Sequence, residues 1–248
     1  MKKRGLKKVL AFAVTAVLVI AGTVAIWRPD ARQVRSAFIP VRLSEKQLIL
    51  DAGHGGEDGG AVSLTGVPES GINLSITMKV DQLLGFYGVS PILLRETDIS
   101  LHDPEADTLR KKKVSDLHNR VATIEAIENA ELLSIHQNTF SNAAYHGAQT
   151  FYRAGEESKA LAQLMQDTLR EGADPENQRT PAKIPDSIYL MKHITCPAVL
   201  VECGFLSNPA EEAKLRNNGY QTRLAACMVS AWLRSGEIQG RKISENVI

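Results

Sequence analysis

The stretch Gln47-Leu-Ile-Leu-Asp51-Ala-Gly-His54-Gly-Gly56 decides the fold of this chain, because it joins a buried strand to a polar turn. Its first five residues form a short apolar run that glycines follow, and such a run predicts a strand inside a sheet. The turn carries an ionisable histidine among three glycines. The stretch therefore predicts a strand whose carboxyl end opens into a functional site.

Strands and helices alternate along the rest of the chain. Short apolar runs predict the strands, and apolar residues at helical spacing predict the helices between them. We expect strands at residues 47–51, 89–94, 132–135, 148–152, 187–191 and 198–201, helices at 70–86, 116–129 and 156–170, one or two closing helices within 211–234, and a long loop at 95–115. This alternation predicts a single α/β domain with a mainly parallel twisted sheet of about six strands and helices on both faces.

The composition excludes several classes of protein. The chain has 248 residues, with 29 Lys and Arg against 28 Asp and Glu, and a formal net charge of +1. A dedicated nucleic-acid binder usually has a large basic excess, and aromatic residues that stack on bases make up only 5% of this chain. We therefore expect an ordinary globular domain and no nucleic-acid partner.

The first 27 residues predict a membrane or signal helix rather than a part of the domain. Residues 1–8 are rich in Lys and Arg, and residues 9–27 carry no charge. About 20 apolar residues span a bilayer, and basic residues on the N-terminal side keep that end in the cytoplasm. A retained anchor is the first interpretation, and a signal peptide cleaved near Thr23-Val24-Ala25 is the second. Both export the rest of the chain, with residues 28–46 as a linker.

Ionisable residues lie at the ends of three predicted strands. His54 follows the first strand, His136 lies in Ser134-Ile-His-Gln-Asn138, and Glu202 follows the last strand. In an open α/β sheet the functional crevice lies beyond the carboxyl ends of the strands, so we expect these side chains to converge. Two imidazoles and a carboxylate form a common catalytic zinc site, which keeps a fourth position for water.

The spacing of the residues leaves the third protein ligand open between two glutamates. Glu57 stands three residues after His54, which is the His-x-x-Glu spacing of zinc carboxypeptidases. Glu69 lies just before a predicted helix, where a side chain is held rigidly and aimed at the edge of the sheet. Spacing alone does not decide between these two ligands.

Four ordered strings resemble the zinc-dependent N-acetylmuramoyl-L-alanine amidases of the type-3 family. The strings are LDAGHGG, PESGINLSI, SIHQN and PAVLVECGFLSN. The resemblance covers residues 47–235, which we expect to form the catalytic domain, with residues 236–248 as a C-terminal tail. It implies hydrolysis of the amide bond between N-acetylmuramic acid and L-alanine in peptidoglycan.

The same resemblance assigns roles to the site residues. It implies one Zn²⁺ per chain on His54, Glu69 and His136, and it therefore favours Glu69 over Glu57 as the third ligand. It also implies that Glu202 is the catalytic residue, which takes a proton from water and passes it to the leaving amine.

Further strings resemble the germination-specific branch of this family, among them Tyr145-His-Gly-Ala-Gln149 and Ile184-Pro-Asp186. That branch acts on spore cortex peptidoglycan, before a separate deacetylase contributes to muramic δ-lactam. The resemblance implies an extracytoplasmic location, in the envelope or between the forespore membranes. Amidases of this family are often inactive until a partner engages them, so an activating protein partner is expected as well.

Other polar residues near the predicted site have roles of their own. We expect Asp51 either to orient His54 from behind the metal or to cap the strand end, and Asn138 to contact the substrate. We expect Arg95 to form a surface salt bridge, with a contact to a peptide carboxylate as the less favoured alternative. The cluster Arg110–Lys113 in the expected loop is typical of a solvated face, with contact to a polymer or a partner as the alternative.

Two other functions fit part of the pattern. A zinc carboxypeptidase that acts on stem peptides would use Glu57 as a ligand and would need an arginine for the terminal carboxylate. A non-enzymatic module that binds the wall or regulates a partner would be expected to lack one of the four site residues, and all four are present.

Overall fold

The computed structural model describes residues 46–245, and it describes the side chains of residues 46–236. The predicted anchor or signal helix at residues 1–27 lies outside the described residues, as does nearly all of the expected linker. Within the described part of the chain, no helix is both long enough and apolar enough to cross a membrane.

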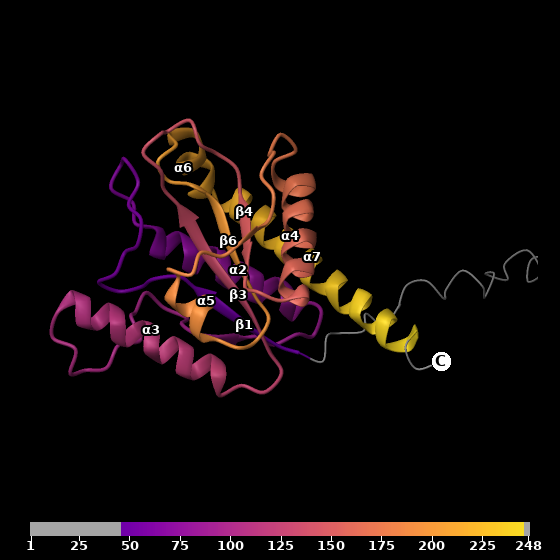
Figure 1. The fold of residues 1–248 in the computed structure, drawn as a ribbon. Helices are drawn as coiled ribbons and strands as arrows, with labels where there is room; N and C mark the ends of the chain where they lie inside the picture. Colours follow the sequence, from indigo (N-terminus) through magenta and orange to yellow (C-terminus); the bar gives the residue numbers. More distant parts are fainter. Residues whose placement is uncertain (1–45, 246–248) are drawn as a thin grey trace, which may run out of the picture. The chain divides into compact units, whose positions relative to one another are not determined.

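A six-stranded sheet forms the centre of the domain (Figure 1). Its strands are β1 (Gln47–Ala52), β2 (Ile92–Leu93), β3 (Ala130–Asn138), β4 (Gln149–Tyr152), β5 (Ala182–Lys183) and β6 (Ala198–Phe205). Their order across the sheet is β2-β1-β3-β6-β4-β5, and every pair is parallel except β4 with β6. The predicted mainly parallel sheet is thus confirmed.

Helices cover both faces of this sheet (Figure 1). The first face packs against α2 (Glu69–Gly85), α4 (Glu156–Ala173) and α7 (Asn218–Glu245), the second against α3 (Leu109–Glu125) and α5 (Tyr189–His193), and α6 (Pro209–Leu215) joins β6 to α7. Successive residues of a strand point to opposite faces, so Leu48 and Leu50 of β1 join the first core while Ile49 joins the second. Both cores are apolar, which fixes the register of the strands and hence the position of their carboxyl ends.

One predicted strand is a helical turn instead. Within the expected strand 187–191, residues 189–191 belong to α5, where the amide of Lys192 donates to the carbonyl of Ile188, and the amide of Ile194 donates to that of Leu190. A short apolar run fits a buried strand and a buried helical turn equally well, so its periodicity did not distinguish them. The strand at the edge of the sheet, next to β4, is β5, which precedes α5 in the sequence.

The helix expected from residue 116 begins earlier, at Leu109. Thr108 caps it, because its hydroxyl accepts a hydrogen bond from the amide of Lys111 at 3.3 Å. The basic cluster Arg110–Lys113 therefore occupies the first turn of α3 rather than a loop. The prediction was wrong here because the exposed first turns of a helix carry no apolar periodicity.

The closing part of the chain, expected to hold one or two helices, holds two. Asn208 caps α6 by accepting hydrogen bonds from the amides of Ala210 and Glu211. The following helix, α7, continues to Glu245, so helix covers most of the residues expected to form a C-terminal tail.

Candidate metal centre

The carboxyl ends of β1, β3 and β6 meet at one edge of the sheet, because these strands are neighbours in it. His54 follows β1, His136 lies near the end of β3, and Glu202 lies near the end of β6. Glu69 is the first residue of α2, which starts over the same edge. Four residues from distant parts of the sequence thus share one site.

Three of these residues form a cluster of ligand atoms. His54 Nε2 lies 3.2 Å from Glu69 Oε1, and His136 Nδ1 lies 3.5 Å from Glu69 Oε2. One nitrogen or oxygen from each residue falls within 4.8 Å of the others. The two imidazole rings meet edge to face, with their centroids 5.1 Å apart. The Glu69 carboxylate therefore faces both imidazoles at once.

The backbone around the cluster is adapted to this close approach. A Cβ atom at Gly53 would overlap the ring of His136, and one at Gly60 would overlap Glu69 and the ring of His54. His54 itself has a φ of 61°, in the left-handed region that residues other than glycine seldom adopt. The glycine-rich turn is therefore a packing requirement of the cluster.

Hydrogen bonds hold the Glu69 carboxylate in place. Oε1 accepts from the amide of Ala61 at 2.7 Å, and Oε2 accepts from the amide of Gln137 at 2.8 Å. The side chain of Asn73, one turn along α2, donates to Oε2 at 3.0 Å. Since the residue is also buried, its carboxylate has little freedom to turn away from the two histidines.

A second carboxylate, Asp58, supports His54 from the other side. Asp58 Oδ2 lies 2.9 Å from His54 Nδ1. Burial lowers the pKa of His54, but the hydrogen bonds with Asp58 and Glu69 outweigh it and raise that pKa to about 9. Burial would raise the pKa of Glu69, and His136 and His54 hold it well below its ordinary value. The site thus concentrates negative charge where a cation would lie.

Asp58 was not among the predicted site residues. The signal that could have found it is its position four residues after His54, within the same glycine-rich turn. A histidine that binds a metal usually donates its other ring nitrogen to a carboxylate or carbonyl, which fixes its tautomer. Asp58 is placed to do so.

The donors present fit a zinc ion. Two histidine nitrogens and one carboxylate are a common ligand set for catalytic zinc, which leaves one position open. Glu57, the rival third ligand, is exposed and bonds to Lys112 Nζ at 2.6 Å and 2.7 Å, outside the cluster. The structure therefore brings together the three residues that the family resemblance assigned, with Glu69 in the third position.

Glu202 stands beside this cluster. It is the register partner of His136 in the parallel pair of β3 and β6, so the two side chains share one face of the sheet. Its Oε2 atom is buried and has no hydrogen-bond partner among the described residues. Burial raises the pKa of Glu202 to about 7, with Glu69 adding to the rise and the two histidines opposing it. The free oxygen points to a partner that the protein itself does not supply.

The expected contact between Asp51 and His54 is not made. The Asp51 carboxylate instead accepts hydrogen bonds from Arg120 Nη1 and from Ser134 Oγ, the latter at 2.6 Å. Arg120 also bonds to Asp116 and donates to the carbonyl of His54 at 2.9 Å. Asp51 therefore acts on the site through Arg120, which holds the backbone of the turn.

Arg95 makes the predicted salt bridge only at long range, with Nη1 4.0 Å from Asp98 Oδ1, and most of its contacts are with backbone carbonyls. Its side chain is buried, and it donates to the carbonyls of Ala52, Gly53 and Ser70 at 2.8–3.1 Å. These carbonyls belong to the end of β1 and to the start of α2. Arg95 thus fastens together the two segments that carry His54 and Glu69.

Asn138 ends β3 and is partly exposed there. Its side-chain oxygen accepts from the amide of Thr139 at 2.8 Å, and its carbonyl accepts from the amide of Leu206 at 2.8 Å. These bonds position the residue at the sheet edge, where its contact with substrate stays a prediction.

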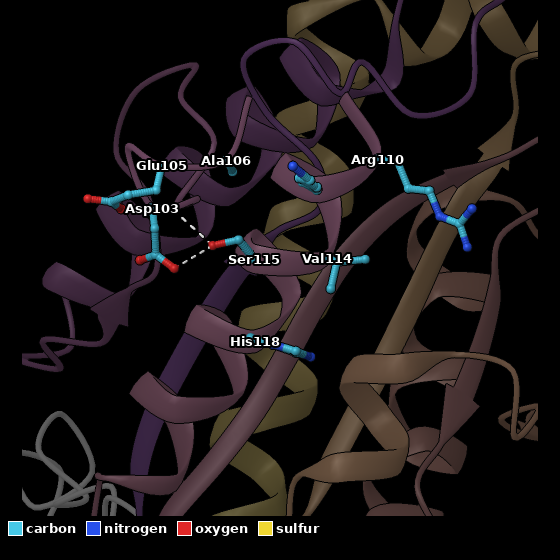
Figure 2. A pocket seen from close by; sticks show the side chains of 8 residues that line it. Asp103, Glu105, Ala106, Arg110, Val114, Ser115 and His118 are labelled. Carbon is cyan, nitrogen blue, oxygen red and sulfur yellow. Dashed lines mark hydrogen bonds between the residues drawn. The ribbon is translucent and has the colours of Figure 1, made fainter. Parts of the chain in front are cut away.

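An open hollow lies beside the first turns of α3 (Figure 2). There Ser115 Oγ donates to Asp103 Oδ2 at 2.7 Å, next to Arg110, Val114 and His118. None of its lining residues belongs to the metal centre. The hollow and the candidate metal cluster are thus lined by different residues.

Comparison with known proteins identifies the family. The family model described as N-acetylmuramoyl-L-alanine amidase matches residues 48–233. The chain belongs to this family. The amidase is 37% identical over 193 residues to the germination-specific N-acetylmuramoyl-L-alanine amidase of Bacillus subtilis, a match that covers 77% of this chain and 80% of that protein. It is 27% identical over 213 residues to the amidase LytC of the same organism, across 38% of that longer protein.

Solved structures agree with this assignment. The CwlD amidase from Clostridioides difficile, solved in complex with the GerS lipoprotein, has a TM-score of 0.75 and 39% identity, covering 78% of this chain and 99% of that one. An N-acetylmuramoyl-L-alanine amidase from Clostridium difficile 630 has a TM-score of 0.66 and 29% identity, covering 76% and 95%. The resemblance noted in the sequence is thus confirmed at the level of the family.

Proposed function

We propose that this amidase is zinc-dependent and that it cleaves the bond between N-acetylmuramic acid and L-alanine in spore cortex peptidoglycan. The observation that carries the proposal is the cluster of His54, Glu69 and His136 with the free carboxylate oxygen of Glu202 beside it. An amide hydrolase needs a polarising centre and a group that moves a proton, and these two elements supply both.

Each of these residues has a separate role in the proposed reaction. Zn²⁺ bound by His54, Glu69 and His136 would polarise the scissile carbonyl and lower the pKa of water. Glu202 accepts a proton from the attacking water at its free carboxylate oxygen and delivers it to the departing nitrogen of L-alanine. Asp58 holds His54 in the tautomer that offers Nε2 to the metal.

One relative supports action on the spore cortex, because the B. subtilis protein is named a germination-specific amidase. A second relative is the CwlD amidase of C. difficile. That CwlD amidase was solved in complex with a lipoprotein, which supports a protein partner for this amidase as well. The apolar segment at residues 9–27 supports export, so substrate and partner would meet the enzyme outside the cytoplasm.

The test is mass spectrometry of peptidoglycan fragments after digestion with the full-length chain in detergent. The enzyme is used as prepared, after removal of metal by a chelator, and after Zn²⁺ is added back. We expect zinc-dependent release of peptides that begin with a free L-alanine amine, and we expect it from cortex peptidoglycan of dormant spores.

Other products would overturn the proposal. Peptides shortened at the carboxyl end, with the muramoyl link intact, would establish a carboxypeptidase instead. Full activity after metal removal, verified by elemental analysis, would exclude the zinc mechanism. Equal cleavage of vegetative wall and cortex peptidoglycan would leave the amidase in place and remove the preference for the spore cortex.

A further inference from the structure

Three side chains lie in one row across the sheet edge that carries the metal centre. His136 of β3 is the register partner of Glu202 of β6, and Glu202 is in turn the register partner of Gln149 of β4. Register partners lie on the same face, with Cβ atoms about 5 Å apart in an antiparallel pair. The row therefore continues from the metal ligands past Glu202 to Gln149.

Arg179 extends this row by one more side chain. Its Nη1 donates to Gln149 Oε1 at 2.7 Å, and its Nε donates to the carbonyl of His146 at 2.8 Å. Gln149 also donates to the carbonyl of Thr180 at 3.0 Å, which binds the loop after α4 to the end of β4. The guanidinium is thus held beside Gln149, which lies one strand beyond Glu202.

Aromatic rings hold the plane of this guanidinium. Its central carbon lies 4.5 Å from the ring centre of Phe205 and 5.7 Å from that of Tyr145. Phe205 is buried, while Tyr145 is 44% exposed and stacks edge to face with Phe140. Such stacking keeps an arginine fork in one orientation.

The guanidinium of Arg179 forms no salt bridge within 4 Å in the described part of the chain, although the charge of Glu211 is near enough to favour its charged form. Its Nη2 atom makes no hydrogen bond with the described residues. The nearby carboxylate of Glu211 is engaged instead by the amides of Gly147 and Phe205, at 2.9 Å each. An oriented, partly exposed guanidinium with free donors suits a planar anion, and a carboxylate fits it best.

We propose that Arg179 binds a carboxylate on the peptide side of the scissile amide and makes the amidase selective for it. The inference rests on the proposed function, because it takes Glu202 as the point where the amide is cut. The sugar side of that bond carries hydroxyl and acetamido groups, whereas the peptide side carries carboxylates. Two extended residues reach roughly 7 Å, which exceeds the spacing of about 5 Å between neighbouring strands, so the residue after L-alanine can carry a carboxylate past β4 towards Arg179.

The test uses two synthetic muramoyl tripeptides that differ only at the residue after L-alanine. One carries a free α-carboxylate there, and the other carries the carboxamide of the same shape. We expect kcat/KM of the wild-type full-length enzyme to be at least about tenfold higher on the carboxylate, because a charge-assisted pair is lost with the amide. The difference should lie mainly in KM.

Variants separate recognition from folding. Arg179→Gln should lower kcat/KM on the carboxylate substrate to the level of the carboxamide and change the carboxamide reaction little. On the carboxylate substrate, the kcat/KM of Arg179→Lys should lie between those of wild type and Arg179→Gln, since lysine keeps the charge but lacks the planar pair of donors of a guanidinium. The matched control is Arg153→Gln, at the opposite end of β4, which should leave both reactions unchanged.

Two results would overturn the inference while leaving the amidase in place. The first is a wild-type enzyme that cleaves both substrates equally well, a result that does not depend on the folding of any variant. The second is an equal loss on both substrates in Arg179→Gln, which would make Arg179 a support for its loop. Cleavage of neither substrate by a zinc-loaded enzyme would overturn this inference and the proposed function together.

Discussion

Glu202 lies directly opposite His136, one strand away, in the parallel pair of β6 and β3. Both side chains therefore meet the same face of the sheet at the same height. His136 faces the Glu69 carboxylate at 3.5 Å, while Glu202 keeps an oxygen atom without a partner among the described residues. The proposed zinc ligand His136 and the proposed proton carrier Glu202 thus lie on neighbouring strands, and mutation can separate these two proposed roles.

Glu202→Gln should leave zinc bound and stop turnover. The amide keeps the shape of the side chain but does not accept and return a proton, and loss of such a group costs about 10²- to 10⁴-fold in rate. The measurement is zinc content by elemental analysis beside the rate of peptide release. His136→Ala is the contrasting variant and should lose both. Full activity in the glutamine variant would reject Glu202 as the proton carrier.

Gly53→Ala should weaken zinc binding although it replaces none of the proposed ligand residues. The added Cβ would overlap the ring of His136, and overpacking of this kind costs about 1–3 kcal/mol. If the ring moves to relieve it, zinc affinity falls roughly 5- to 150-fold. The measurement is a competition titration of zinc against a chelator. Gly71→Ala is the matched control, because nothing lies within 4 Å of the atom it adds. Equal affinities in the two variants would contradict the packing argument.

Asp58→Asn should lower zinc affinity about 10- to 100-fold, the usual cost of losing a carboxylate that supports a metal-binding histidine. The reason is the bond of 2.9 Å between Asp58 and His54 Nδ1, which the amide replaces with a weaker one. The neighbouring Glu57→Gln serves as control, and the same competition titration should find it close to wild type. A large loss in the control would restore Glu57 as a ligand.

The sequence was sufficient for the α/β fold and for the residues gathered at its edge. Each of β1, β3 and β6 contains a short buried apolar run, from which its position could be predicted. His54, His136 and Glu202 follow these runs in the sequence. Parallel topology then brings the carboxyl ends of these strands together. The choice of Glu69 over Glu57 needed the family resemblance, because it depends on how a glycine-rich turn folds.

What the sequence did not reveal depends on contacts between distant residues. Arg95 looked like a surface residue, yet it is buried and donates to four backbone carbonyls, and no local pattern marks such a role. Arg120 likewise reaches Asp51 across 69 positions of sequence. The helical turn α5 was read as a strand because a few apolar residues carry too little periodicity to decide between the two.

The last prediction concerns the free energy of unfolding and follows from the buried ion pair of Asp51 and Arg120. Both side chains are almost fully buried, at 1% and 2% exposure. Burial would raise the pKa of Asp51, but the charge of Arg120, with the bonds from Arg120 and Ser134, holds it below its ordinary value of 3.8. Asp51→Asn leaves Arg120 with Asp116 as its remaining anion, and breaking a buried pair costs about 3–5 kcal/mol.

The lowered pKa of Asp51 determines how its contribution to the free energy of unfolding changes with pH. A carboxyl group with a lowered pKa in the folded state contributes stability above its unfolded pKa and loses it as the pH falls through the folded value. Chemical unfolding followed by circular dichroism should therefore give Asp51→Asn a lower free energy of unfolding than wild type at pH 7. The difference between the two free energies should become smaller below about pH 4. Asp186→Asn, on an exposed aspartate, should stay within about 0.5 kcal/mol of wild type throughout. A gap that stayed constant from pH 7 to pH 3 would mean that Asp51 stabilises the fold by its shape and not by its charge.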